Sequence, residues 1–98
     1  MKLIISETAR ADLKDIAVYI ARDNPERALT FVEELVERMT VVGERPMIFQ
    51  AQPEYGDDIR SAPHRGYRIL FSANEECVTI LHVTHGSRDL ENLIRGKP

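Results

Sequence analysis

The sequence has a single cysteine, no long apolar run and fewer basic than acidic residues, and each of these features excludes some classes of protein. Because Cys77 is alone, neither a disulfide within the chain nor a Cys-x-x-Cys metal site can form. A membrane-spanning helix needs a run of about 18 apolar residues, which is absent. Residues 1–6 become polar too early for the apolar part of a signal peptide, so we expect a cytoplasmic protein.

Acidic side chains outnumber basic ones, and the charge is unevenly distributed along the chain. The chain has 13 Lys and Arg against 16 Asp and Glu, for a net charge of -3. Residues 1–58 carry 7 basic and 12 acidic side chains, and residues 59–98 carry 6 and 4. Since phosphate neutralisation drives most affinity for nucleic acid, this chain is a poor candidate for wrapping DNA or RNA. Local recognition by the more basic half stays open.

Length and composition indicate one folded domain over residues 1–98. A chain of 98 residues can build one modest core but not two. Its content of 43% hydrophobic and 30% charged residues is that of an ordinary globular domain. No repeat, linker or low-complexity tract divides it.

Two amphipathic helices are predicted in the first half. Ser6 is a suitable N-cap for a helix ending near Arg22, and Asn24 followed by Pro25 is a restart signal for a second helix. We expect Gly43 to end the second helix in a left-handed conformation. The apolar stripes of the two helices are Ala9, Leu13, Ile16, Ala17 and Ile20, then Ala28, Phe31, Val32, Leu35, Val36, Met39 and Val42.

Short strands are predicted at residues 2–5, 58–62, 66–72 and 77–84, with turns at 63–65 and 73–76 and a loop over 44–57. The last three strands should form an antiparallel meander, and the helices must cover one face of the sheet. The predicted fold class is therefore α+β, an N-terminal helical hairpin packed on a small, twisted antiparallel sheet.

The predicted sheet fixes the positions of two arginines. Alternation along the strand at 66–72 sends Tyr67, Ile69 and Phe71 to one face and Arg68 with Leu70 to the other. Arg88 comes just after the last strand, where its side chain can reach over the sheet. Guanidinium groups on rigid elements suit the recognition of phosphate or carboxylate.

The segments Gly-Tyr-Arg-Ile-Leu-Phe at 66–71 and His-Gly-Ser-Arg-Asp at 85–89, preceded by the two helices, resemble the ParE branch of the RelE/ParE toxin superfamily. The resemblance covers nearly the whole chain. It implies the toxin of a type II toxin–antitoxin module, which binds DNA gyrase without catalysing a reaction and needs no cofactor. It also implies a ParD-like antitoxin with a ribbon-helix-helix domain, in a heteromeric complex that contacts DNA only through the antitoxin.

Two alternatives remain. RelE-like relatives cut messenger RNA on the ribosome, and in this chain Arg68, Arg88 and His85 would carry that reaction. The tyrosine that the best-known nucleases use corresponds here to Ile94, which cannot transfer a proton. The second alternative is a non-toxic orphan that binds only an antitoxin.

Histidines and arginines supply the remaining candidates. His82 and His85 should point to opposite faces of their strand, so we expect no shared metal. Contact with the target is expected from Arg60, Arg65, Arg68, His85 and Arg88. For Arg60 and Arg65, ion pairs with Asp57, Asp58 or Asp89 explain the sequence equally well. The candidate antitoxin contacts are Leu13, Ile16, Ile20, Phe31 and Leu35.

Overall fold

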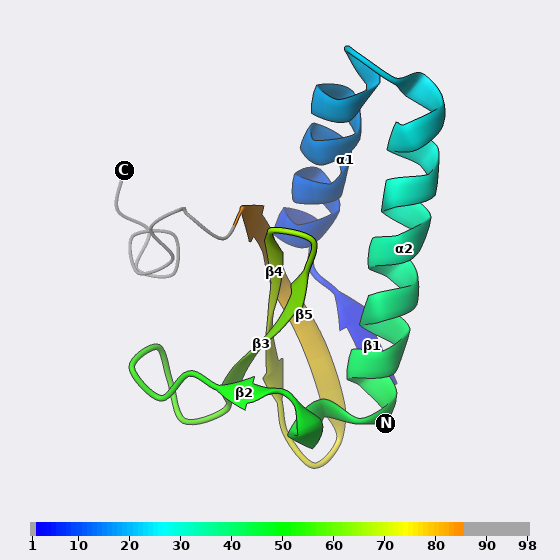
Figure 1. Ribbon diagram of the computed structural model, residues 1–98. Helices are drawn as coiled ribbons and strands as arrows, with labels where there is room; N and C mark the ends of the chain where they lie inside the picture. The colour runs from blue at the N-terminus through cyan, green and yellow to red at the C-terminus, as the bar shows by residue number, and fades with distance from the viewer. Residues whose placement is uncertain (1, 86–98) are drawn as a thin grey trace.

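The computed structural model describes residues 2–85, which form a helical hairpin on one side of a single sheet (Figure 1). The elements in chain order are β1 (Lys2–Ile5), α1 (Glu7–Ala21), α2 (Pro25–Glu44), the short 3-10 helix η1 (Pro46–Ile48), β2 (Gln50–Ala51), β3 (Ile59–His64), β4 (Tyr67–Ala73) and β5 (Cys77–His85). Within these residues no helix is long and apolar enough to cross a membrane. The α+β class predicted from the sequence is confirmed.

The sheet is mixed rather than purely antiparallel. Its strand order is β1-β5-β4-β3-β2. β2, β3, β4 and β5 pair antiparallel, as the predicted meander requires for the last three. β1 instead lies parallel to β5, with Lys2 opposite Cys77 and Ile5 opposite Ile80. The whole helical hairpin and most of the sheet separate these two strands in sequence, so no local pattern could reveal their direction.

Both helices begin where the sequence predicts. The Ser6 hydroxyl oxygen accepts a hydrogen bond from the Ala9 N–H at 3.0 Å, and the Asn24 side-chain oxygen accepts one from the Arg27 N–H, also at 3.0 Å. Pro25 occupies the first turn of α2, where its missing N–H costs nothing. These caps fix the short connection, so α1 and α2 pack against each other in a hairpin.

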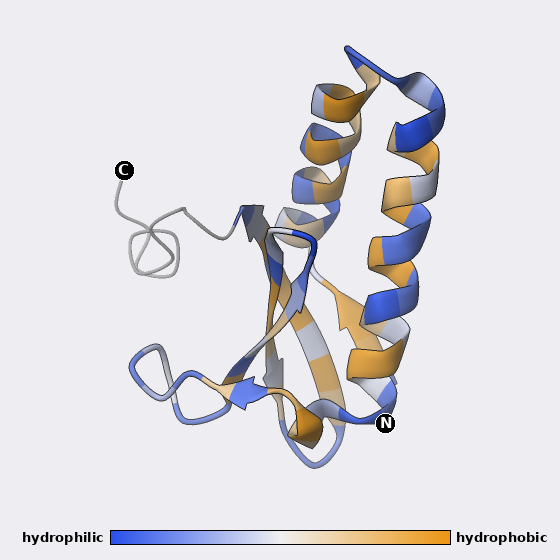
Figure 2. Ribbon diagram, in the orientation of Figure 1, coloured by the Kyte–Doolittle hydropathy of each residue, from blue (hydrophilic) through white to orange (hydrophobic). Residues whose placement is uncertain are grey.

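The core lies between the hairpin and the sheet. Register pairs Ile69 with Val83 and Phe71 with Ile80, and all four side chains are buried beneath the helices. In Figure 2 the apolar residues of the helices and the strands run as stripes. The predicted alternation along β4 is confirmed, because Arg68 pairs with Pro63 and is exposed on the other face.

Gly43 does not end α2 in a left-handed conformation. The helix continues to Glu44, and Gly43 is buried within it against β1. A Cβ at Gly43 would lie 3.3 Å from the Leu3 Cβ. This glycine therefore permits a close approach of helix and strand, a reason that the sequence alone does not show.

The segment after α2 is more ordered than the predicted loop, since it contains η1 and β2. The turn between β3 and β4 also differs from the prediction. It consists of Arg65 and Gly66, while Pro63 and His64 belong to β3. Pro63 is tolerated there because β2 pairs with β3 only as far as Ser61. Among the described residues no strand pairs with Pro63 on that side, so its missing N–H costs no ladder bond.

Candidate functional site

Arg68 and His85, two predicted target contacts, lie on opposite faces of the sheet. Arg68 is exposed on the face away from the helices. His85 pairs with Tyr67 on the helix side, where the two rings stack edge to face with centroids 5.4 Å apart. His82 pairs with Leu70 on the outer face, so the expectation that His82 and His85 point apart is confirmed. Among residues 2–85 no cluster of side chains could hold a metal.

Arg60 faces the helices rather than the open side of the sheet. It lies opposite Phe71, and its Nη1 donates a hydrogen bond to the Phe49 carbonyl oxygen at 2.7 Å. This bond ties β3 to the segment after η1. Arg60 and Arg68 therefore do not share a basic patch on the outer face, which corrects the expectation from the sequence.

Arg65 points toward α2, where Glu34 contacts three basic side chains. Glu34 accepts hydrogen bonds from Arg27, its Oε1 lies 3.0 Å from His64 Nε2, and the same oxygen lies 3.3 Å from Arg65 Nε. The bond from Arg27, followed by that from His64, lowers the pKa of Glu34 to about 2. We call these four residues the Glu34 cluster. It fastens the β3–β4 turn to the middle of α2.

Aromatic rings continue from this cluster toward the end of β5. Arg27 lies over the Phe31 ring at 5.1 Å. Phe31 in turn contacts His64 and Tyr67, with ring centroids 5.6 and 5.4 Å apart, and Tyr67 contacts His85. The Glu34 cluster is thus connected to His85 through the rings of Phe31 and Tyr67.

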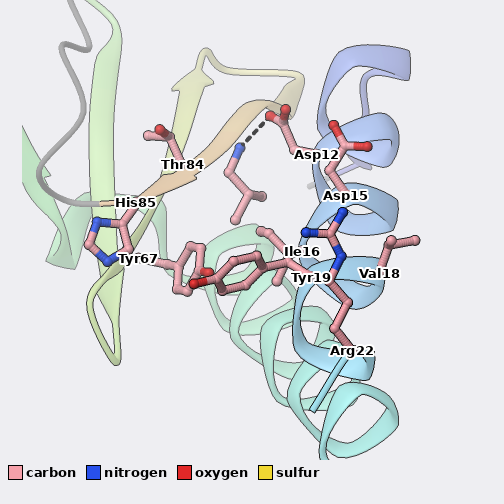
Figure 3. A pocket seen from close by; sticks show the side chains of 10 residues that line it. Asp12, Asp15, Ile16, Val18, Tyr19, Arg22, Tyr67, Thr84 and His85 are labelled. Atoms are coloured by element: carbon pink, nitrogen blue, oxygen red, sulfur yellow. Dashed lines mark hydrogen bonds between the residues drawn. The ribbon is translucent and has the colours of Figure 1, made fainter. Parts of the chain in front are cut away.

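A groove of about 680 Å³ runs between α1 and the ends of β4 and β5 (Figure 3). Tyr19 stands on its helical wall and is 66% exposed, and Tyr67 and His85 form the sheet wall. The full lining is Asp12, Asp15, Ile16, Val18, Tyr19, Arg22, Tyr67, Val83, Thr84 and His85. Sequence periodicity did not reveal this groove, because Tyr19 and Val18 fall outside the apolar stripe of α1.

The predicted antitoxin contacts lie mainly inside the chain. Ile16, Phe31 and Leu35 are buried in the core, and Leu13 and Ile20 are partly buried against it. Phe31 and Leu35 cannot meet a partner without leaving the core, whereas Ile16 also lines the groove and Leu13 and Ile20 are only partly buried. The exposed apolar residues of the helices are Val18, Tyr19, Leu29, Val36 and Val41. Val36, which the sequence placed in the core stripe, is 41% exposed.

Arg88 and Ile94 lie outside the described residues, as does the rest of the segment at 86–89. Their predicted roles stay predictions.

Comparison with known proteins identifies a family whose model matches this chain and a solved structure with a similar fold. The family model described as "ParE toxin of type II toxin-antitoxin system, parDE" matches residues 3–90. No curated protein matches the chain. A solved chain of the chromosomal ParDE TA system from P. aeruginosa is similar with a TM-score of 0.72 and 23% sequence identity. The match covers 87% of this chain and 95% of that one. At this identity the likeness shows a common fold.

Proposed function

The chain belongs to the ParE toxin family of type II toxin–antitoxin systems, and on that basis we propose that it arrests growth by binding DNA gyrase. In this proposal the protein acts in the cytoplasm and stabilises the cleaved-DNA state of gyrase. Because a ligand that prefers one state of an enzyme shifts its population, no catalytic step is needed.

One observation favours a binding protein over a ribosome-dependent nuclease. RNA cleavage would need a proton-transfer group and a cation near the same phosphate. Arg68 and His85 are on opposite faces of the sheet, so these two candidates do not converge on one reacting group. His85 instead packs against Tyr67 on the helix side.

A ParD-like antitoxin is the proposed partner. The groove between α1 and the sheet, with exposed Val18 and Tyr19 in its lining, offers apolar surface near acidic and basic groups. A tail with an apolar helix and charged flanks, folding as it binds, suits such a surface. This proposal moves the expected contacts from the buried Phe31 and Leu35 to the lining of the groove, which includes Ile16.

Expression of the chain alone and with its antitoxin tests the proposal. Growth arrest accompanied by DNA damage and loss of gyrase supercoiling, and relieved by the antitoxin, is the expected result. Purified protein should leave messenger RNA intact on programmed ribosomes. Codon-phased cleavage would establish the nuclease alternative, and binding to an antitoxin without any growth arrest would identify an orphan.

A further inference from the structure

The β3–β4 turn has an unusual backbone for its sequence. Arg65 has a φ of 46°, and it is the one residue other than glycine with positive φ within residues 2–85. Gly66 follows with a φ of 85°, and His64 pairs with Tyr67 across the turn. Two-residue hairpin turns with two positive φ angles favour Asn-Gly or Gly-Gly. An arginine in the first position costs conformational energy that asparagine would largely avoid.

The ion pair of Arg65 does not explain why an arginine occupies this position. Its side chain is 68% exposed, and exposed pairs stabilise a protein little. Glu34 is already bonded to Arg27 and His64, and the His64 ring packs on Phe31. The turn is therefore fastened to α2 without Arg65.

Positive charge gathers around this turn although the chain is acidic. Beside it lies a shallow hollow of about 530 Å³ between α2 and β3, lined in part by Arg38, Arg65, Glu34 and Glu37. Arg27, in the Glu34 cluster, adds a third arginine, whereas Arg68 lies on the other face of the sheet. These three arginines outnumber the two glutamates, although the whole chain carries a net charge of -3.

We propose that the β3–β4 turn is a preorganised recognition turn, in which Arg65 binds a carboxylate of an acidic segment in a protein partner. A guanidinium on a stiff turn loses little freedom when it forms a bidentate pair with a carboxylate. A protein partner is favoured over nucleic acid, because the acidic helical half repels a long phosphate backbone. The inference deepens the proposed function by giving the chemistry of one partner contact.

The test compares Arg65→Asn, which suits the backbone of the turn, with Arg65→Lys, which keeps the charge and the strained conformation. Arg10→Ala removes an exposed arginine on α1 and is the matched control. Melting temperature is measured for each folded variant. Binding is measured at low ionic strength with a polyglutamate peptide, a polyglutamine peptide and a single DNA strand of equal length.

Arg65→Asn should melt at or above the wild-type temperature and bind polyglutamate at least about fivefold more weakly. Arg10→Ala should bind polyglutamate nearly as wild type does. Arg65→Lys should bind with an affinity between those of wild type and Arg65→Asn, because an ammonium keeps the charge but cannot form the bidentate pair. Glu37→Gln should bind polyglutamate more tightly, because a like charge is removed from the hollow. Polyglutamine should not bind.

Several results would overturn the inference. A clear fall in the melting temperature of Arg65→Asn would make Arg65 structural. Absent polyglutamate binding, or binding that is insensitive to Arg65→Asn, would remove the recognition role, and tighter binding of DNA would assign the turn to nucleic acid. None of these measurements depends on toxicity, so failure of the turn and failure of the toxin proposal are distinguishable.

Discussion

Asp12 on α1 accepts a hydrogen bond from the backbone N–H of Val83 on β5, with 2.9 Å between nitrogen and oxygen (Figure 3). β1 pairs with β5 only as far as Ile80, so within residues 2–85 no strand pairs with Val83 on that side. Near the start of the same helix, Ser6 donates its hydroxyl to the Leu81 carbonyl oxygen at 3.1 Å. Side chains at the start of the hairpin thus replace the missing strand and hold β5 beside the groove.

Asp12→Ala should lower the free energy of unfolding by about 1–3 kcal/mol, because the Val83 N–H loses its acceptor in a partly buried place and the His82 ring loses its contact with the same oxygen at 3.5 Å. Asp12→Asn should cost less, since its amide oxygen can still accept the bond. Urea denaturation with an unchanged m-value measures both. Asp15→Ala, an exposed position on the same helix, is the control and should stay within about 0.5 kcal/mol of wild type. Equal effects of Asp12→Ala and Asp15→Ala would contradict the capping role.

Glu34 should make stability depend on pH in the acidic range. Hydrogen bonds from Arg27 and His64 lower its pKa in the folded state to about 2, from an ordinary value of 4.5. A depressed carboxyl pKa stabilises the fold above the ordinary value, and this contribution disappears as the pH falls toward about 2. The difference in unfolding free energy between wild type and Glu34→Gln should therefore be constant near neutral pH and shrink below pH 4.5.

Denaturation of both proteins at a series of pH values measures this difference. Glu37→Gln, one turn along α2, controls for the loss of a glutamate from the same helix. A wild-type minus Glu34→Gln difference that stays flat down to pH 2 would show that the Glu34 cluster does not hold the turn in solution.

Local signals in the sequence were sufficient for the helices and for the faces of β4. Ser6, Asn24 and Pro25 act through neighbours a few residues away, so their roles follow from spacing alone. The alternation around Arg68 is local in the same way. The exposed position of Arg68 on the outer face could therefore be predicted from the sequence.

Contacts between residues that are far apart in the sequence could not be predicted. Glu34 and His64 are 30 residues apart, and nothing near either residue signals that they meet. The face that Arg60 takes depends on the register of β3 with β4, which the two-residue turn sets, and the longer turn expected from the sequence gives a different register. The contact between α2 and β1 at Gly43 depends on Leu3, which precedes the whole hairpin in the sequence.

Gly43→Val should destabilise the protein by about 1–3 kcal/mol through crowding of β1. An added Cβ already lies 3.3 Å from the Leu3 Cβ, and Leu3 is held by the pairing of β1 with β5. Gly43→Ala should cost less, because better helix propensity offsets part of the crowding. Thermal unfolding of both variants gives the comparison. Stabilisation by valine would show that the close contact is not maintained in solution.

Substitutions at Arg60 and Arg68 should have different effects on stability and on toxicity. Arg60→Ala removes a 2.7 Å hydrogen bond to the Phe49 carbonyl in a half-buried place, so we expect a loss of about 1–3 kcal/mol in unfolding free energy. Arg68→Ala removes an exposed side chain from the outer face and should stay within about 0.5 kcal/mol of wild type.

If the outer face meets the target, Arg68→Ala should nevertheless relieve growth arrest at equal expression, and Arg68→Lys should restore part of the growth arrest. Urea denaturation and growth curves on the same set of variants measure the two effects. A fully toxic Arg68→Ala would move the target contact away from this face, and an unfolded one would make Arg68 a structural residue.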